Sequence, residues 1–355
     1  MTVVGLALLT LVPGELGGSE TYIRELLHAL AEVGELDYRV LLPPAAAELE
    51  TGLPSEVATE YRRARTPRER LVAMAAAAAR PAPLSTRLQE VDVAHYPLTI
   101  RLPAVDAPTV VTLHDVQHLD LPHLFGRAER AFRAAAWHRS VRSADRVVVP
   151  SGFVRDRAVA KLGLEPTRVV VIHSGVDHAR FRPGSAEREP FLLYPARRWP
   201  HKNHQRLFEA FGRLRAELPE LRLVLTGDGS PVATPDGVEA LGLVAPDALV
   251  DLYQRASALV FPSLYEGFGQ PPLEAMACGC PVACSNAGAL PEVVGDAARL
   301  FDPRDPGAIV DAVRDVLDMP DDWSRRGLER AAAYSWEATA RGHEDVYRSL
   351  ASTRS

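Results

Sequence analysis

Short apolar runs alternate along the chain with longer segments in which apolar residues recur every three or four positions. A continuous apolar run of about four to eight residues is typical of a buried parallel strand, whereas a period of about 3.6 residues indicates an amphipathic helix. In the first half the pattern predicts strands at Val3–Val12, Tyr38–Leu42, Val91–Tyr96, Thr109–Leu113, 146–149 and 168–172. It predicts helices between them at Ser19–Val33, Arg127–Arg142 and 153–162. This alternation is typical of an α/β domain built on a doubly wound parallel sheet.

The alternation stops at RPGSAEREP, residues 182–190, which has the composition of a linker between domains. Beyond it the same pattern starts again, with strands predicted at 191–195, Leu221–Thr226, 256–263 and 281–285. The helices predicted there lie at Gln205–Ala216, Asp247–Ala256, 306–317 and 322–333. The sequence therefore predicts two domains, at 1–183 and 190–335, and a separate last helix at 336–350.

The stretch from Tyr265 to Gly279, YEGFGQPPLEAMACG, follows one predicted strand of the second domain. It reads as a glycine-rich turn and then a helix, since Pro271 and Pro272 suit a first helical turn, where a missing N–H costs little. A strand, a glycine-rich turn and a helix present backbone amides and the positive end of a helix dipole to an anion. Because proline has no N–H, the donors left for a phosphate are the amides of Gly267, Phe268, Gly269, Gln270 and Leu273.

Two glutamates in this stretch suit different partners. Glu274 falls in the first turn of the helix, where it would repel a phosphate bound to the same amides. We therefore expect it to accept hydrogen bonds from neutral hydroxyls, such as those of a ribose. Glu266, on the turn, could accept from the hydroxyls of a second ring. The pair alone is weak evidence, because an acidic residue in a first turn also stabilises a helix without any ligand.

Composition and charge fit a globular protein of about two domains. The 355 residues are 47% hydrophobic, with a mean hydropathy of −0.06. A net charge of −6 and a pI near 6.0 argue against a general nucleic-acid-binding protein. The opening MTVVGLALLTLV lacks the basic region and cleavage site of a secretory signal, and no segment approaches the roughly 20 apolar residues that cross a bilayer. We therefore expect a first buried strand and a cytoplasmic protein.

The three cysteines, Cys278, Cys280 and Cys284, form an odd and closely spaced set that is typical of a reducing compartment. Their spacing invites a metal site, but no fourth ligand lies near them in the sequence, and Cys280 and Cys284 bracket the strand-like PVA. We expect all three to pack in the core, and we expect no metal.

The residues around Glu266 and Glu274 strongly resemble the retaining glycosyltransferases of family 4, whose signature is a glutamate, seven residues and a second glutamate. EGFG before the pair and EAMACG around its second member make the match specific, and the resemblance covers nearly the whole chain. It implies the GT-B fold, in which two Rossmann-like domains face a central cleft and the last helix crosses back to the first domain. In the family, the first glutamate contacts the transferred sugar and the second contacts the ribose of the nucleotide.

Three glycine-bearing segments also match the family. Within GELGGSE, Gly17 and Gly18 match the loop that meets the sugar phosphate of the donor and the acceptor, although Ser19 could make the segment a simple helix cap. TGDGS and ALGLV, at 226–230 and 240–244, match strand ends near the nucleotide base, which backbone groups near Val244 contact in relatives.

His114 lies in VTLHDVQH, directly after a predicted strand, and matches the histidine that in the family touches the donor sugar. With Asp115 and His118 it also forms an HD-x-x-H string that occurs in metallohydrolases. The further ligand motifs of such a centre are not evident. We expect Asp115 to orient a ring or a loop, and His118 to contact the acceptor or to be structural.

Arg197 and Lys202, five positions apart in YPARRWPHKNH, match the arginine and lysine that clamp the phosphates of the donor in the family. Fixed cations there stabilise the negative charge that develops on a leaving pyrophosphate. Ala196 stands where the family usually has a glycine before the arginine, and Arg198 adds a second cation. The arginine of the clamp is therefore either Arg197 or Arg198.

The resemblance implies a hexosyltransferase that uses a nucleoside diphosphate sugar as co-substrate, retains the anomeric configuration and needs no metal or other cofactor. The sequence context is most similar to mannosyl- and rhamnosyltransferases, so GDP-mannose is the first donor expected, with UDP- or dTDP-sugars as the alternative. The acceptor is a hydroxyl on a glycan, a lipid-linked molecule or a small molecule. A retaining glycosidase would have no use for a phosphate clamp. A non-catalytic partner subunit that binds nucleotide sugars is disfavoured because the set of site residues is intact.

The segment from Pro44 to Pro83, between the strands predicted at Tyr38–Leu42 and Val91–Tyr96, departs from the alternation. It carries the basic cluster YRRARTPRER followed by the alanine-rich LVAMAAAAAR. We expect a solvated helix face and packing through short side chains. The alternative is a peripheral contact of residues 61–80 with the inner face of the membrane, since many relatives act on lipid-linked acceptors.

Overall fold

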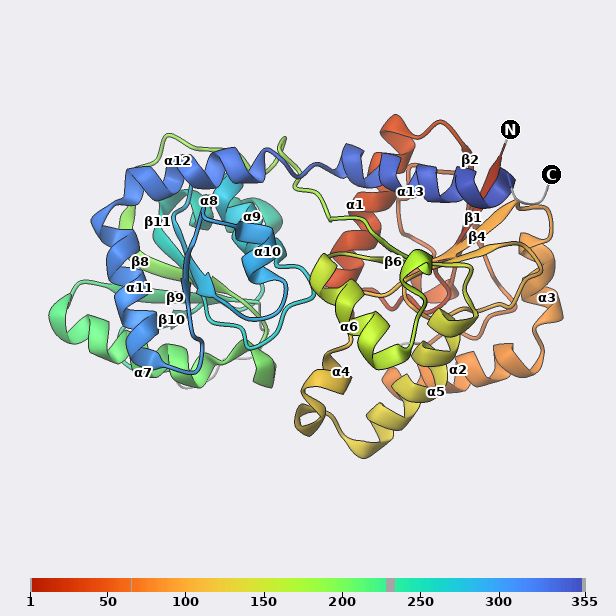
Figure 1. Cartoon of the computed structure of the whole chain (residues 1–355), viewed down its shortest axis with the longest axis horizontal. Coiled ribbons are helices and arrows are strands. Elements are labelled where there is room, and N and C mark those ends of the chain that lie inside the picture. Colours follow the sequence, from red (N-terminus) through yellow and green to blue (C-terminus); the bar gives the residue numbers. More distant parts are fainter. Residues whose placement is uncertain (1, 65, 228–233, 353–355) are drawn as a thin grey trace. The chain divides into compact units, whose positions relative to one another are not determined.

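The structure is a computed structural model that describes residues 2–64, 66–227 and 234–352. Contacts divide the chain into two compact units (Figure 1). Unit 1 is Met1–Gly175 with Trp336–Ser355, and unit 2 is Val176–Ser335. This boundary precedes both of the limits predicted from the sequence, 183 and 190.

The residues that follow Gly175 belong to unit 2 because they pair with its last residues. Val176 forms a parallel bridge with Ser335, and its N–H donates to the carbonyl of Tyr334 at 3.3 Å. His178 Nε2 donates to the same carbonyl at 2.9 Å. Segments that are joined by hydrogen bonds in this way belong to one packed body.

Unit 1 is built on a seven-stranded sheet in the order β3-β2-β1-β4-β5-β6-β7, in which all neighbouring strands are parallel. Its strands are β1 Val3–Ala7, β2 Asp37–Leu42, β3 Ser55–Val57, β4 Val93–Tyr96, β5 Thr109–Thr112, β6 Arg146–Val149 and β7 Val169–Val171. Its helices are α1 Gly18–Val33, α2 Pro67–Ala79, α3 Ala82–Ser85, α4 Gln117–Asp120, α5 Arg127–Ser143, α6 Gly152–Leu162 and α13 Trp336–Ala351.

Two hydrophobic cores cover the two faces of this sheet. Residues of α1 and α13 form one core, which includes Tyr22, Trp336 and Tyr347. Residues of α2, α5 and α6 form the other, which includes Tyr61 and Val116. In Figure 1 the last helix, α13, runs beside α1, the first helix of the chain.

Unit 2 repeats this plan with a six-stranded parallel sheet in the order β10-β9-β8-β11-β12-β13. Its strands are β8 Glu189–Pro195, β9 Arg222–Thr226, β10 Val238–Ala240, β11 Ala256–Phe261, β12 Val282–Ser285 and β13 Arg299–Phe301. Its helices are α7 His204–Glu217, α8 Pro246–Arg255, α9 Gln270–Ala277, α10 Leu290–Val294, α11 Pro306–Asp318 and α12 Pro320–Ala331. The prediction of two doubly wound α/β sheets is confirmed.

The first strand is shorter than the predicted Val3–Val12, because the chain turns after Ala7. The N–H of Leu11 donates to the carbonyl of Leu8 at 2.8 Å, which closes the turn. Both side chains stay buried, with 0% and 1% exposed. The apolar run therefore predicted burial correctly and strand length wrongly. The short strands β3, β10 and β13 lack an apolar run, and the sequence did not predict them.

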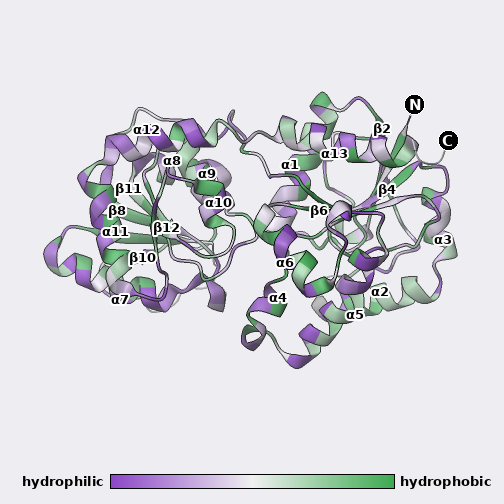
Figure 2. Cartoon of the chain, in the orientation of Figure 1, coloured by the Kyte–Doolittle hydropathy of each residue, from purple (hydrophilic) through white to green (hydrophobic). Residues whose placement is uncertain are grey.

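The alanine-rich segment forms α2, as predicted. Ala73 and Ala77 are buried, whereas Leu71 and Val72 are 43% and 50% exposed. Figure 2 shows hydrophobic colours along much of this helix. No helix in the described ranges is long and apolar enough to cross a membrane. Membrane contact through residues 61–80 stays a prediction.

The three cysteines are buried free thiols, which fits the predicted packing role. Burial raises the pKa of Cys278 and of Cys280 to about 12, so both stay protonated at neutral pH. Within the part of the chain that the structure describes, no group of three or more His, Cys, Asp or Glu residues is placed to hold a metal ion.

Candidate functional site

The order of the unit 2 sheet reverses between β8 and β11, because β9 and β10 lie on one side of this pair and β12 and β13 on the other. Ligands of doubly wound sheets bind at the carboxyl ends of strands beside such a reversal. The loop after β8 carries Arg197 and Lys202, and the loop after β11 carries Glu266. Three predicted site residues therefore lie at the expected edge of one sheet.

Lys202 and Glu266 are in direct contact. The distance from Lys202 Nζ to Glu266 Oε1 is 2.6 Å, and the two side chains are only 13% and 14% exposed. The ammonium also lies 5.1 Å from the ring centroid of Phe261, at the end of β11. A charge-assisted hydrogen bond with little access to water holds its members more firmly than an exposed ion pair does.

Asn203, which the sequence analysis missed, holds the backbone next to Lys202. Its φ of 62° places it in the left-handed region, which asparagine tolerates better than most residues. Its side-chain Nδ2 donates to the carbonyls of Pro262 at 3.0 Å and Pro303 at 2.7 Å. The Tyr194 hydroxyl donates to the carbonyl of Lys202 at 2.6 Å. These bonds tie the loop after β8 to neighbouring strand ends.

The loop that carries Glu266 is held by close backbone packing. Gly288 has a φ of 65°, and a Cβ at this position would lie 2.5 Å from the Glu266 carbonyl oxygen. The N–H of Ala289 donates to that carbonyl at 3.0 Å. Gly269 has a φ of 122°, and a Cβ there would meet Leu290 at 2.6 Å. Glycine is therefore required at positions 269 and 288 by conformation and by space.

Helix α9 begins at Gln270, with the predicted prolines directly after it, and Glu274 lies in its interior, so the predicted first-turn position of Glu274 is wrong. Glu274 is 8% exposed, and its Oε2 accepts a hydrogen bond from the Tyr253 hydroxyl at 3.1 Å. Burial, reinforced by Glu274, raises the pKa of Tyr253, so this residue stays a phenol that can donate. The Leu273 side chain is fully buried, so only its backbone could contact a ligand. Phe268 packs edge-on against Tyr334 at 5.9 Å between ring centroids.

Arg197 follows β8 beside the end of β9. The N–H of Ala196 donates to the carbonyl of Thr226 at 2.9 Å. Gly227, with a φ of 108°, approaches so closely that a Cβ would lie 3.1 Å from the Arg197 nitrogen. The Arg197 guanidinium lies 5.7 Å from the Trp199 ring. Residues 228–230 of TGDGS lie outside the described residues, and the choice between Arg197 and Arg198 stays a prediction.

The remaining predicted residue of unit 2, Val244, is half-buried in the loop between β10 and α8. The end of β9 approaches this loop, since the N–H of Gly227 donates to the carbonyl of Gly242 at 2.9 Å. Backbone groups of the loop therefore lie beside the same strand ends as Arg197.

In unit 1, His114 follows the end of β5. Its Nε2 lies 2.8 Å from the carbonyl oxygen of Pro97. Because a carbonyl can only accept, Nε2 carries the proton, and Nδ1 of the neutral ring is an acceptor. Burial lowers the pKa of His114, so the ring is neutral at pH 7. A neutral acceptor nitrogen is suited to a hydroxyl group.

Tyr22 packs edge-on against His114, with ring centroids 5.0 Å apart, and connects it to α13. His343 Nδ1 donates to the carbonyl of Thr339 at 2.8 Å, so its Nε2 accepts from the Tyr22 hydroxyl at 2.9 Å. Positions 22 and 343 are far apart in the sequence, and no local motif links them. The sequence analysis therefore missed Tyr22 and His343.

The predicted glycine loop leads into α1. Gly17, with φ 55° and ψ −130°, is the N-cap of the helix, and no side chain caps this end. The expectation that Ser19 caps the helix is wrong, because Ser19 lies one residue inside it. The N–H of Gly14 donates to Glu20 Oε2 at 2.7 Å, which closes the loop. Nothing lies within 4 Å of a Cβ built on Gly18, so this backbone borders open space.

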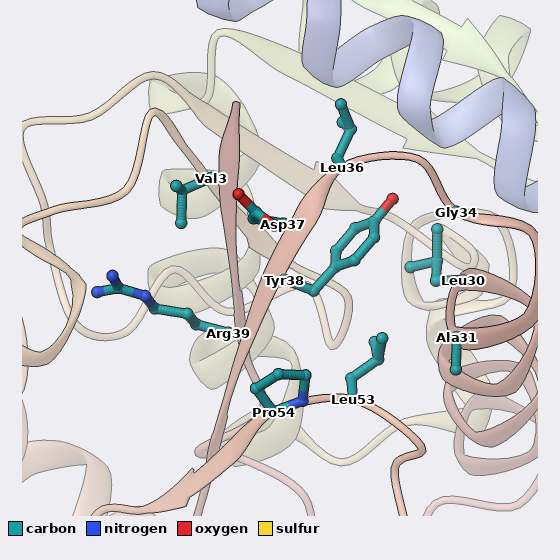
Figure 3. Close-up of a pocket in the computed structure, with 10 residues that line it drawn as sticks. All are labelled: Val3, Leu30, Ala31, Gly34, Leu36, Asp37, Tyr38, Arg39, Leu53 and Pro54. Atoms are coloured by element: carbon teal, nitrogen blue, oxygen red, sulfur yellow. The ribbon is translucent and has the colours of Figure 1, made fainter. Parts of the chain in front are cut away.

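A hollow of about 410 Å³ lies in unit 1 at the opposite edge of the sheet (Figure 3). Val3 and Asp37, which line it, start strands β1 and β2. The Tyr38 hydroxyl beside it donates to Glu344 Oε1 of α13 at 2.5 Å. Because the amino ends of parallel strands rarely bind ligands, we place the candidate site at the carboxyl ends.

Two family models match the chain. The model described as Glycosyl transferases group 1 matches residues 176–334, and the model described as Glycosyltransferase Family 4 matches residues 16–180. O-antigen chain mannosyltransferase B of Escherichia coli is 32% identical over 64% of this chain and 67% of its own length. A D-inositol 3-phosphate glycosyltransferase of Streptomyces coelicolor is 29% identical over 68% of this chain and 64% of its own length.

Solved structures share the fold. Sucrose-phosphate synthase of Thermosynechococcus elongatus superposes with a TM-score of 0.82 at 22% identity, covering 99% of this chain and 100% of that one. An Anabaena protein solved in complex with UDP and glucose has a TM-score of 0.74 at 17% identity, with 99% and 100% covered. At these identities the likeness shows the fold, which is the predicted GT-B fold. Together with the family models and the mannosyltransferase, it shows that the chain belongs to glycosyltransferase family 4.

Proposed function

We propose that this glycosyltransferase moves a hexosyl unit from a nucleoside diphosphate sugar to an acceptor hydroxyl, with retention of anomeric configuration and without a metal ion. The observation that carries the proposal is the contact between Lys202 and Glu266. In this contact an ammonium, which suits a phosphate, lies beside a carboxylate oxygen, which suits sugar hydroxyls. A donor that joins a sugar to a diphosphate presents these two chemistries next to each other.

In this proposal Arg197 and Lys202 bind the diphosphate, helped by the amides of Gly267, Phe268, Gly269 and Leu273. As a phosphate arrives, the Lys202 ammonium shares its three donors between the phosphate and Glu266. Glu266 then accepts from hydroxyls of the transferred sugar. Glu274 accepts from the ribose, with Tyr253 orienting its carboxylate.

The remaining predicted residues take the outer parts of the donor. Backbone groups near Val244 contact the base, and Gly17 and Gly18 allow a close approach of backbone to the sugar phosphate and the acceptor. His114, neutral and with Nδ1 as acceptor, contacts a hydroxyl of the donor sugar.

Transfer forms a bond from the acceptor oxygen to the anomeric carbon as the bond from that carbon to the phosphate oxygen breaks. The proton of the acceptor hydroxyl passes to the leaving phosphate oxygen on the same face of the sugar. The cations at positions 197 and 202 stabilise the charge that develops on this oxygen, a type of stabilisation typically worth about 10²–10³ in rate for each group.

The first donor proposed is GDP-mannose, supported by the 32% identity to a mannosyltransferase. UDP- or dTDP-sugars are the alternative, and the UDP-bound Anabaena structure shares the fold. Calorimetric titration with GDP, UDP, dTDP and ADP tests the donor class, and Glu274→Gln should weaken binding of the preferred nucleotide. Failure of every nucleotide to bind would contradict the proposal.

Transfer itself is tested with the matching sugar nucleotide and a set of hydroxyl acceptors. Release of the nucleoside diphosphate that depends on an acceptor separates an enzyme from a non-catalytic partner subunit. Activity that is lost in EDTA and restored by Mg²⁺ would overturn the metal-independent mechanism.

A further inference from the structure

Unit 1 contains a half-buried cation that has no counter-ion among the described residues. Arg70, at the start of α2, forms no ion pair within the described residues, and its buried Nε has no hydrogen-bond partner. Burial lowers the pKa of Arg70, since removing a guanidinium from water disfavours its charged form. A charge that is partly removed from water is costly to the extent of its burial unless something pairs with it.

The hydroxyl of Tyr61 is the second unpartnered group. Tyr61 is 3% exposed, and its buried hydroxyl has no hydrogen-bond partner among the described residues. Burial raises the pKa of Tyr61 to about 12, and the charge of Arg70, which acts on this hydroxyl, offsets part of the rise. Most buried polar groups are hydrogen-bonded in native proteins, so two neighbouring exceptions indicate a missing partner.

Both residues lie near the carboxyl ends of the unit 1 strands. Tyr61 lies in the segment between β3 and α2. Helix α4, which follows the end of β5, begins with Gln117 and His118, which are 8% and 3% exposed. Gln117 Nε2 and His118 Nδ1 are also buried without a hydrogen-bond partner among the described residues. This is the edge that carries His114.

The second cation of this region, Arg133, is already balanced. Its guanidinium contacts Glu129 at 2.9 Å and Asp115 at 3.9 Å, and it lies over the Trp137 ring at 4.2 Å. The carboxylate that acts on Arg70, Glu15, is not within ion-pairing distance. Arg133 therefore has no capacity for a further anion, whereas Arg70 does.

We propose that Arg70 and Tyr61 bind an anionic group, a phosphate or a carboxylate, on the acceptor substrate. The inference rests on the proposed transfer function and names the acceptor class. A guanidinium and a phenol present N–H and O–H donors, which suits an anion that only accepts. The anion belongs to a water-soluble acceptor or to the phosphate of a lipid-linked one.

The test is calorimetric titration of the full chain with inorganic phosphate in the Lys202→Met background, which removes one cation of the proposed donor phosphate site and weakens binding there. Arg70→Gln should weaken phosphate binding by about 10-fold or more, since hydrogen bonds to charged groups are typically worth about 1.5–3 kcal/mol. Tyr61→Phe should weaken it by less, because the arginine remains. Arg68→Gln, at an exposed position of the same helix, is the matched control and should bind as the background does.

A melting curve without ligand separates binding from structure. Arg70→Gln should leave the melting temperature unchanged or raise it, because an unpaired, half-buried charge is removed. A lower melting temperature, or unchanged phosphate binding, would overturn the proposal. Nucleotide binding by Arg70→Gln should equal that of the parent, so failure of this site is distinguishable from failure of the donor site.

Competition experiments identify the source of the anion. If glycerol 3-phosphate displaces inorganic phosphate and vesicles of phosphatidylglycerol do not, the result supports a water-soluble acceptor. Displacement by the vesicles supports a lipid-borne phosphate. If neither probe displaces inorganic phosphate from the Arg70 site, the result contradicts an acceptor role.

Discussion

Both units present polar side chains at the carboxyl ends of parallel strands, but they satisfy these groups in different ways. In unit 2 the charged groups have close partners, as in the contacts of Lys202 with Glu266 and of Tyr253 with Glu274. In unit 1 the buried histidines are kept neutral, and Arg70 lacks an ion pair in the described part of the chain. Lys202, Glu266 and Glu274 of unit 2 thus have partners before any ligand arrives, whereas Arg70 and Tyr61 of unit 1 leave donors for a ligand to satisfy.

The largest expected effect breaks the balance in unit 2. Lys202→Met removes the cation proposed to stabilise the leaving phosphate and leaves the Glu266 carboxylate without its partner. We expect kcat/KM for the sugar nucleotide to fall by about 10²–10³, the typical cost of losing one preorganised charge-stabilising group. Initial rates of nucleoside diphosphate release measure it.

Lys161→Met is the matched control, since Lys161 is exposed in the last turn of α6. It should leave kcat/KM unchanged. Equal rates for Lys202→Met and the parent would show that the ion pair only stabilises the fold, and the proposed mechanism would then be wrong.

The second effect probes the neutral histidines of unit 1. Burial lowers the pKa of His343 from 6.5 to about 4, so between these values the unfolded chain binds a proton that the folded chain does not. Stability from this residue is therefore present above pH 6.5 and is lost as the pH falls toward 4. The loss is about 3 kcal/mol, at about 1.4 kcal/mol for each pH unit.

Urea unfolding at pH 7, 5.5 and 4 measures this loss. His343→Gln cannot take up the proton, so its free energy of unfolding should fall less steeply with acid than that of the parent. His28→Gln, at an exposed histidine of α1, should keep the parental slope. Identical slopes for all three proteins would show that His343 is not buried in its neutral form.

The contrast between the units also explains what could be predicted from sequence. Unit 2 displays its candidate site in continuous strings, so Lys202, Glu266 and Glu274 were proposed from spacing and family resemblance. Their supports were not, because Gly288 acts through a positive φ and a close approach to a distant loop. Such geometry depends on tertiary packing and has no local pattern.

In unit 1 the same limit is more severe. His114 was proposed through the family resemblance, but Tyr22 and His343 meet only because α13 packs on α1. The turn after Ala7 shows a related limit, because the apolar run that continues through it reports burial and not backbone conformation. The alternation of strands and helices was predictable because it repeats along the chain, whereas the site supports join distant segments.

The third effect isolates the close packing around Glu266. Gly288 and Gly163 both have a φ of 65°, but nothing lies within 4 Å of a Cβ on Gly163, whereas a Cβ on Gly288 meets the Glu266 backbone. Gly163→Ala should cost about 1 kcal/mol, from the left-handed conformation alone. Gly288→Ala should cost roughly 1–2 kcal/mol more, because overpacking is added. Urea unfolding of both variants measures the difference, and equal losses would show that the loop can move aside.

The smallest expected effect separates charge from orientation at Glu274. Glu274→Gln keeps an oxygen that can accept from Tyr253 but removes the charge, so nucleotide affinity should fall by about 10-fold, within the range for a charged hydrogen bond. Tyr253→Phe keeps the charge and removes only the orienting hydroxyl, so the loss should be smaller, about 2- to 5-fold. Calorimetry with the preferred nucleotide and with its 2′,3′-dideoxy analogue distinguishes the role of the Glu274 charge from that of its orientation by Tyr253. Since the analogue lacks the ribose hydroxyls, Glu274→Gln should bind it as the parent does, and a remaining 10-fold difference would place Glu274 away from the ribose.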